Sequence, residues 1–248
     1  MIEARQLKKS FGPQRVLDGV DLRVEKGESV VIIGRSGGGK SILLKHLIGL
    51  LRPDEGDVII DGETIAGMNE RQLLKVRRKF GMLFQGAALF DSLTVAENVA
   101  FVFQREGKLT EPEIAKKVDQ ALDMVDLGGT QDKKPAELSG GMRKRVGLAR
   151  AIVYEPEIVL FDEPTTGLDP IVADSIDQLI VRVREQLEVT TVAVTHDMRS
   201  ARRLGQRIMM LHDRRIYATG TADEIFQSQD PIVRQFIDGV SDPKEHYF

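Results

Sequence analysis

Four short apolar runs place the strongest constraint on the fold of this chain, because each run ends abruptly in a polar residue or a glycine. They cover residues 29–33, 80–84, 158–161 and 191–195. Short runs rich in β-branched residues are typical of strands buried on both faces, which is the pattern of a parallel sheet. Ligands of open α/β sheets bind beyond the carboxyl ends of the strands, so we expect the residues after these runs to form a site.

Helical patterns alternate with these runs, which favours an α/β fold. Residues 41–51 follow the first run directly, and residues 174–187 have the pattern of an amphipathic helix. Ser139 is expected to cap a third helix. Its apolar stripe comprises Met142, Val146, Ala149 and Val153, whereas Arg143, Lys144, Arg145 and Arg150 lie mostly off that stripe.

Residues 93–127 interrupt the alternation with a mainly helical pattern. We therefore expect a single domain over residues 1–248, with an α/β core at 1–85 and 156–229. A helical subdomain at about 86–155 would be inserted into this core, and a C-terminal tail would follow at 230–248.

The composition is that of a globular protein, with 42% apolar and 29% charged residues. The formal net charge of −3 provides no basic field that would indicate nucleic acid as a partner. The sequence contains no cysteine, which excludes disulfides and thiolate metal sites and fits a reducing compartment. Lys45 and His46 interrupt the most apolar segment, which is far shorter than the ~20 residues of a membrane span. We expect a soluble protein, or one held on a membrane by a partner.

The segment GRSGGGKS lies between the first run and a helical pattern and fits the phosphate-binding pattern G-x-x-x-x-G-K-[ST]. Glycines let successive backbone N–H groups turn towards a polyphosphate, and the helix N-terminus adds its dipole. The lysine can reach the β- and γ-phosphates of ATP, and the serine hydroxyl can bind Mg²⁺. A flexible glycine turn with a solvated lysine is the alternative, which the position between strand and helix disfavours. The residues of this loop are Gly34, Arg35, Ser36, Gly37, Gly38, Gly39, Lys40 and Ser41.

The other three runs end in side chains that suit a nucleotide and its metal ion. Asp162 is expected to hold Mg²⁺, and Glu163 to orient or deprotonate the attacking water. His196 would contact the γ-phosphate or the water, and the amide of Gln85 would reach Mg²⁺ or water. Each has a structural alternative, because paired acids often cap helices, a lone histidine is more often structural, and an amide can simply end a strand.

A second glycine-rich helix start, LSGGM at residues 138–142, predicts a second anion site. One nucleotide does not need two such sites from opposite ends of one chain. Two chains arranged head to tail would each close the other's site. An ordinary glycine helix cap is the alternative.

These motifs together resemble the nucleotide-binding subunits of ABC transporters over nearly the whole chain. The resemblance rests on residues 34–41, Gln85, 138–142, 158–164, 167–170 and His196. It implies a P-loop NTPase cassette with a RecA-like core, an N-terminal antiparallel β region and a helical subdomain. In that family two cassettes enclose two ATP molecules.

The resemblance also implies roles for individual residues. Ser139, Gly140 and Gly141 would meet the γ-phosphate held by the other copy, and Asp169 would lie at the seam of the dimer. Phe11 would stack on adenine, although a surface aromatic on a turn is the alternative. The usual signature of the family ends in glutamine, whereas this chain has Met142 at that position. A side-chain hydrogen bond from that position is therefore not expected.

A narrower resemblance joins residues 81–101, 137–152 and 230–239 to the MlaF-type ATPases of bacterial phospholipid transport, which maintain outer-membrane lipid asymmetry. It implies a membrane permease resembling MlaE, and also MCE-domain (MlaD-like) and STAS-domain (MlaB-like) subunits. The chain would then lie on the cytoplasmic face of the inner membrane, held there by the permease. Residues 86–98 would contact the permease through Leu89, Phe90, Leu93 and Val95, unless these form a local core. The tail at 230–248 is expected to pack across the dimer.

Two other functions share part of this pattern. An ABC ATPase for another transport substrate, such as an amino acid or a drug, would have every catalytic motif. A soluble ABC ATPase acting on nucleic acid or ribosomes would typically have two cassettes or long coiled-coil insertions, and this sequence shows neither. The complete set Lys40, Asp162, Glu163 and His196 disfavours a nucleotide sensor that does not hydrolyse ATP.

Overall fold

The computed structural model describes residues 1–240, and the side chains of all of these except 104–106. The chain divides into two compact units. Unit 1 consists of residues 1–25 and 29–68 and of the chain from residue 194 onward, and unit 2 consists of residues 26–28 and 69–193.

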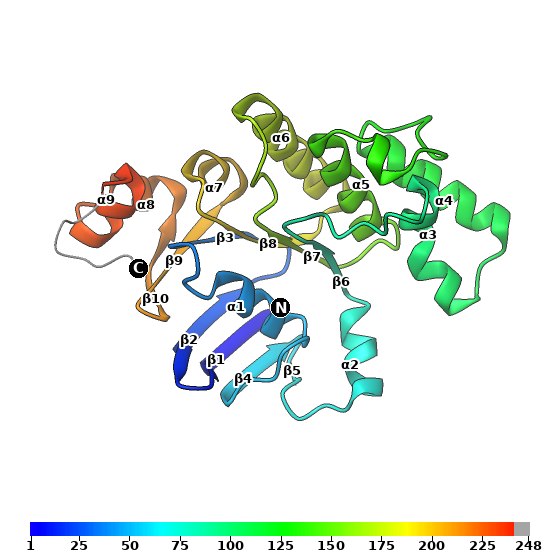
Figure 1. The fold of residues 1–248 in the computed structure, drawn as a ribbon. Helices are drawn as coiled ribbons and strands as arrows, with labels where there is room; N and C mark the ends of the chain where they lie inside the picture. Colours follow the sequence, from blue (N-terminus) through cyan, green and yellow to red (C-terminus); the bar gives the residue numbers. More distant parts are fainter. Residues whose placement is uncertain (241–248) are drawn as a thin grey trace. The chain divides into compact units, whose positions relative to one another are not determined.

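Unit 1 contains an antiparallel sheet in which the strands follow the order β2-β1-β4-β5 (Figure 1). The strands are β1 (Ile2–Phe11), β2 (Gln14–Val24), β4 (Glu55–Ile60) and β5 (Glu63–Thr64). Ile2 and Ala4 of β1 and Val20, Leu22 and Val24 of β2 are buried at alternate positions, as expected of a sheet with one face against the core, and register shifts interrupt the alternation elsewhere. The predicted N-terminal antiparallel region is confirmed.

A second group of strands in unit 1 has the order β10-β9-β3. In this group β3 (Ser29–Ile33) is parallel to β9 (Arg207–His212), and β9 is antiparallel to β10 (Arg215–Thr221). Every residue of β3 is buried, as its uninterrupted apolar sequence predicts. Helix α7 (Met198–Leu204) packs against β3, and α8 (Ala222–Gln227) packs against β9 and β10.

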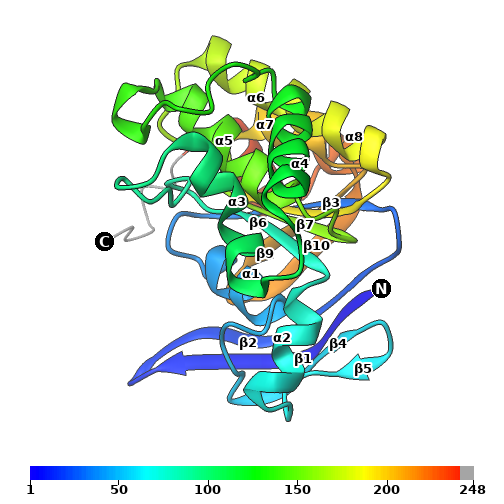
Figure 2. The same cartoon turned by 90° about the vertical axis from the view of Figure 1, so that its right-hand side faces the viewer.

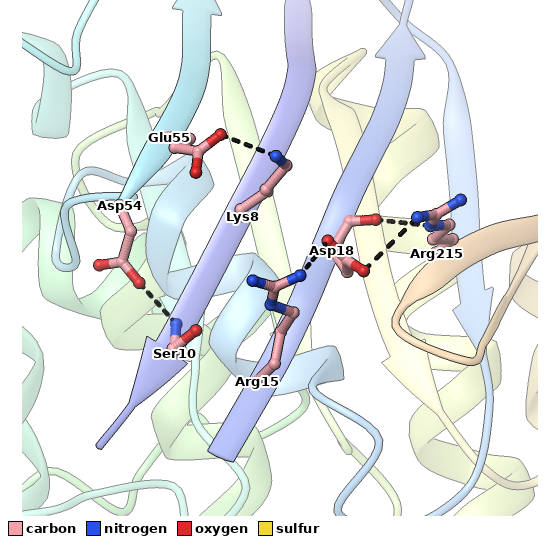
Figure 3. A network of polar contacts seen from close by, with 7 residues as sticks. All are labelled: Lys8, Ser10, Arg15, Asp18, Asp54, Glu55 and Arg215. Atoms are coloured by element: carbon pink, nitrogen blue, oxygen red, sulfur yellow. Dashed lines mark hydrogen bonds and ion pairs between the residues drawn. The ribbon is translucent and has the colours of Figure 1, made fainter. Parts of the chain in front are cut away.

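Polar contacts join the two groups of strands in unit 1 (Figure 3). The Arg215 guanidinium donates to the Asp18 backbone carbonyl over 2.7 Å and to its carboxylate over 3.4 Å, while Arg15 pairs with the same carboxylate over 3.1 Å. Lys8 on β1 pairs with Glu55 on β4 over 2.7 Å. Ion pairs this exposed contribute little to stability, so those of Asp18 orient the β2–β10 contact more than they stabilise it.

Helix α1 (Lys40–Leu47) is shorter than the predicted helix over 41–51. Gly49 has a φ of 69°, and its N–H donates to the carbonyl of His46 over 2.9 Å. The Leu50 N–H donates to the Lys45 carbonyl over 2.8 Å, which completes a Schellman C-cap. The glycine therefore ends the helix although the apolar pattern continues past it.

Unit 2 contains the strand order β8-β7-β6. Strands β6 (Phe80–Leu83) and β7 (Ile158–Asp162) are parallel, and β8 (Thr190–Thr195) begins in this unit. All residues of β6 and β7 are buried, so the predicted runs at 80–84 and 158–161 are confirmed as strands.

Helices α3 (Val95–Glu106), α4 (Glu111–Met124) and α5 (Gly140–Ile152) pack against one another in unit 2 (Figure 2). This unit also contains α2 (Glu70–Arg77), the 3₁₀ turn η1 (Pro135–Glu137) and α6 (Pro170–Leu187). Helix α6 starts earlier than the predicted 174, because Asp169 caps it and Pro170 occupies its first position. Within residues 1–240 no helix is both long enough and apolar enough to span a membrane.

The last helix of unit 1, α9 (Pro231–Asp238), covers the first part of the predicted tail. Val233 is buried, whereas Ile232, Phe236 and Ile237 are half-buried. Residues 241–248, the remainder of the predicted tail, lie outside the described residues.

Candidate functional site

The glycine-rich loop of unit 1 wraps around the ammonium group of Lys40. This ammonium donates to the backbone carbonyls of Gly34 over 2.7 Å and of Arg35 over 3.0 Å, and Lys40 is only 5% exposed. The Gly38 N–H closes the loop by donating to the Arg35 carbonyl over 3.0 Å. The predicted strand–loop–helix context is confirmed, since the loop joins β3 to α1.

Two glycines of this loop are required by close contacts. A Cβ added to Gly34 would lie 2.5 Å from the backbone oxygen of Leu211, because the loop leaves β3 beside the parallel strand β9. Gly39, which precedes α1, has a φ of 97°, and a Cβ there would lie 3.0 Å from Val16 Cγ1. A side chain at either position would push the loop away from β9 or β2, so these two glycines allow the loop to pack closely against the strands.

A cavity of about 380 Å³ opens beside the loop within unit 1. Its charged lining includes Arg15, Arg35 and Arg214 against one carboxylate, Asp213. The excess of cationic side chains favours an anionic ligand next to the phosphate-binding loop.

Phe11 is the last residue of β1 and is 46% exposed. The Lys9 ammonium lies 5.6 Å from the centroid of its ring. An exposed ring at the end of a strand is available for stacking on a base. His196 follows β8 directly and is also exposed.

In unit 2 the register of two parallel strands brings the other predicted residues together. Leu83 of β6 pairs with Phe161 of β7, so Gln85 and Glu163 each lie two residues beyond a paired position. Asp162 and Glu163 are 6% and 7% exposed, whereas Gln85 is exposed. The register thus places these residues at the same end of β6 and β7, and their roles in the reaction stay predictions.

The backbone at Glu163 is strained. Its φ of 50° lies in the left-handed region, which costs a residue with a Cβ about 1–2 kcal/mol. The Thr166 hydroxyl donates to the Glu163 carboxylate over 3.0 Å, which fixes the side chain in this conformation. Such strain is typical of functional positions held by their surroundings.

The predicted cap of α5 is confirmed, since Ser139 Oγ accepts a hydrogen bond from the Met142 N–H over 3.2 Å. A Cβ on Gly140 would lie 3.1 Å from Leu168 Cδ2, and a Cβ on Gly141 would lie 2.7 Å from Val172 Cγ1. The two signature glycines are therefore needed for packing within the chain itself.

Asp169 caps α6, and its Oδ1 accepts the N–H groups of Ile171 over 3.0 Å and Val172 over 3.1 Å. This capping role is additional to the predicted position at a dimer seam. Ser139, Asp169 and Ile171 are all exposed, and Ile171 is 83% exposed although it is apolar.

The model of the ABC transporter family matches residues 17–166. This chain belongs to the ABC transporter family. A Mycobacterium leprae protein described as a probable ribonucleotide transport ATP-binding protein, mkl, is 43% identical over 238 residues, which are 96% of this chain and 69% of that protein. The chain spans only 66% of the corresponding Mycobacterium tuberculosis protein.

Two further comparisons bear on the ABC assignment. The intermembrane phospholipid transport system ATP-binding protein MlaF of Haemophilus influenzae is 40% identical over 242 residues, covering 98% of this chain and 92% of that protein. A dimeric ATP-binding cassette in a post-hydrolysis state with ADP and phosphate superposes with a TM-score of 0.81 at 35% identity, covering 90% of this chain and 99% of that one. The chain is therefore an ABC ATPase of the MlaF-like group, and the predicted P-loop cassette fold is confirmed.

Sequence reasoning missed one buried residue of this ABC cassette. Lys144 lies off the predicted apolar stripe of α5, yet it is only 5% exposed, and its burial was not predicted. The stripe over Met142, Val146, Ala149 and Val153 is only one buried face of the helix. Gly141, Leu148 and Ala151 form a second buried face that includes Lys144. A lysine at this helical spacing among small and apolar residues is the signal that would have found it.

Proposed function

We propose that this ABC ATPase powers phospholipid transport, as a head-to-tail dimer that closes on MgATP and reopens after hydrolysis. The enclosure of the Lys40 ammonium by the loop of Gly34–Gly39 supports ATP as the ligand. The relative from Haemophilus influenzae, which the chain matches along nearly its whole length, supports phospholipid as the class of cargo.

The residues present fit the magnesium ion of MgATP. We propose that it is held by the Ser41 hydroxyl, the Gln85 amide oxygen and the Asp162 carboxylate, which are hard oxygen donors of the kind Mg²⁺ prefers. The ion would supply charge neutralisation on the β- and γ-phosphates. The loop that encloses the Lys40 ammonium supports the placement of the phosphates against its backbone.

The chain's own residues would then carry out hydrolysis. Glu163 would accept a proton from the water whose oxygen attacks the γ-phosphorus, while the bond from that phosphorus to the β-phosphate oxygen breaks. Lys40 would stabilise the charge on the phosphates, and His196 would orient the γ-phosphate or the water. Phe11 would stack on adenine.

The second copy would complete each site. We propose that Ser139, Gly140 and Gly141 of one copy meet the γ-phosphate bound by the other, with Asp169 at the seam. The exposure of Ser139 and of Ile171, beside Asp169, supports a surface covered in an assembly.

The proposed membrane partner is a permease resembling MlaE, with MCE-domain (MlaD-like) and STAS-domain (MlaB-like) subunits. It would hold the ATPase at the cytoplasmic face of the inner membrane. Phe90, which is 44% exposed, and the half-buried Leu89 and Leu93 support a contact on the segment 86–98. Val95 is fully buried and belongs to the helical core instead.

Glu163→Gln tests the catalytic part of this proposal. The variant keeps the side-chain volume but removes the base, so ATP binding should persist and a dimer should accumulate with ATP. The steady-state ATPase rate should fall by two orders of magnitude or more. Near-normal turnover would remove Glu163 as the base.

Lys40→Ala is the companion variant and should weaken nucleotide binding itself. The cargo is tested separately, by isolating the membrane complex and identifying its lipids. ATPase stimulation by an amino acid, a ribonucleotide or a drug, and none by phospholipid, would contradict the transport assignment and leave the ATPase assignment intact.

A further inference from the structure

The Lys144 ammonium joins two segments that sequence reasoning assigns to the reaction. It donates to the backbone carbonyl of Gln85 and, over 3.2 Å, to the backbone carbonyl of Glu163. The carboxylates of Asp162 and Glu163 lie close enough to favour its charged form, although burial lowers the Lys144 pKa more strongly. The ammonium group therefore lies near both acids, and these two hydrogen bonds go to backbone carbonyl oxygens.

The position of Lys144 on α5 links its two hydrogen bonds to the start of the helix. Gly140 begins α5 and Lys144 lies one turn further along, on the same side of the helix. The first turn of α5 is part of the signature segment, which in the proposed function contacts the γ-phosphate of the ATP bound by the other copy. A shift of this turn would therefore move the two carbonyls that Lys144 holds.

Hydrogen bonds hold the loop that begins at Gln85 to α5 and α3, so we expect this loop to move together with α5. Arg150, two turns further along α5, donates to the carbonyls of Ala87 over 2.6 Å and Ala88 over 2.7 Å. Both alanines have left-handed backbone conformations, with φ of 59° and 49°. The buried Asn98 side chain holds the next part of the loop by accepting the Phe90 N–H over 2.8 Å and donating to the Phe90 carbonyl over 3.1 Å.

A purely packing role explains this lysine poorly. Burying an ammonium costs several kcal/mol, and apolar residues of similar volume in place of buried charges are often neutral or stabilising. The neighbouring buried positions of α5 are small or apolar, so a methionine would fit the site by volume. The charge of Lys144 is therefore explained by its hydrogen bonds to the Gln85 and Glu163 carbonyls and not by packing.

We propose that Lys144 is a positioning residue of the ATPase reaction, which links the signature end of α5 to Gln85 and Glu163 of the same chain. This inference rests on the proposed function, since the signature of one copy serves the nucleotide of the other. Lys144 then couples the nucleotide bound by one copy to the Mg²⁺ ligand and general base of the second copy.

The test compares Lys144→Met with Arg145→Met in the full-length chain. Arg145 is a matched control, because it lies on the same helix and donates to a backbone carbonyl, that of Val125, over 2.9 Å, but contacts neither Gln85 nor Glu163. We expect Lys144→Met to lower kcat by about tenfold to a hundredfold, as small misplacements of catalytic groups do. The Kd for ATP should change less than about threefold, since the Lys40 loop is not altered.

Two further readouts separate positioning from simple loss of structure. The Hill coefficient of ATPase activity against ATP should fall towards 1 in Lys144→Met and stay at the wild-type value in Arg145→Met. Lys144→Arg, which keeps a cation and donors, should recover most of kcat. If Lys144→Met fails to fold, Lys144→Arg and Lys144→Gln carry the same comparison.

The outcomes are distinct from those for the proposed function. Wild-type kcat and Hill coefficient in folded Lys144→Met would overturn the inference, as would equal losses in Lys144→Met and Arg145→Met. If Glu163→Gln still hydrolyses ATP normally, the proposed function fails first. If Glu163→Gln is inactive while Lys144→Met is normal, only the positioning role fails.

Discussion

Gly141 gives a quantitative test of why the signature segment contains glycine. In the proposed function, a glycine at position 141 lets the backbone approach a phosphate. A Cβ at Gly141 would also lie 2.7 Å from Val172 Cγ1 on α6. Carbon atoms normally pack at about 3.5–4.0 Å, so the two helices would have to separate by about 1 Å. We predict that Gly141→Ala destabilises the protein through this contact.

The expected size follows from two opposing contributions. Overpacking of this kind costs about 1–3 kcal/mol. Alanine in a helix gains about 0.5–1 kcal/mol over glycine, so the net destabilisation should be about 1–2 kcal/mol. Val172 is half-buried, and Val172→Ala alone should cost about 1 kcal/mol. In the double variant the clash is absent, which predicts a favourable coupling of about 1–3 kcal/mol.

Urea unfolding of the wild type, both single variants and the double variant measures this coupling. Gly67→Ala is the control, because a Cβ at Gly67 meets no atom within 4 Å, and its stability should stay within about 0.5 kcal/mol of the wild type. Additive effects of the two substitutions would refute the packing argument. If the double variant is stable again but its ATPase activity stays low, the glycine has a separate role towards the partner's nucleotide.

Three other variants test particular contacts. Gly34→Ala should weaken ATP binding about tenfold or more in calorimetric titration, because its Cβ would lie 2.5 Å from the Leu211 backbone oxygen. Asn98→Ala should cost about 1–3 kcal/mol in urea unfolding, since it removes the hydrogen bonds of the buried Asn98 side chain to the partly buried backbone of residues 90–94. Burial raises the pKa of Tyr154 to about 12, which favours its neutral form in the folded state. The resulting stability is full below pH 10 and is lost as the pH rises towards 12, so unfolding at pH 9 and 11 should show a fall that is smaller in Tyr154→Phe.

The buried strands could be predicted from the sequence because no polar or charged residue interrupts their apolar runs. Residues 80–84 and 158–161 are uninterrupted apolar runs, and the structure places β6 at Phe80–Leu83 and β7 at Ile158–Asp162. The parallel arrangement then fixes which residues follow the strands at the same edge. Gln85, Asp162 and Glu163 could be named for this reason alone, before any contact was known.

The helix ends were harder to predict because local capping overrides the apolar pattern. The predicted helix over 41–51 ends at Leu47, where Gly49 and Leu50 satisfy the last carbonyls. The predicted start at 174 lies four residues inside α6, because the Asp169 carboxylate already caps the helix ahead of Pro170. A pattern of apolar residues predicts which face of a helix is buried, but it does not predict the residue at which the helix begins.

Among residues 1–240, Lys40 and Lys144 are both buried and make the same kind of contact with different consequences. Lys40 and Lys144 are each 5% exposed, and each donates to two backbone carbonyls in segments that follow buried strands. The Lys40 carbonyl contacts lie within the loop that would hold a phosphate, so a phosphate oxygen would take over its hydrogen bonds and gain a charge-assisted contact. The Lys144 contacts lie outside that loop, at the carbonyls of Gln85 and Glu163, so we expect them to persist through binding and hydrolysis. Lys40 belongs to a motif because the ligand requires it, whereas Lys144 belongs to no ligand-binding motif and is recognised by its burial on the second face of α5, which packs against β6.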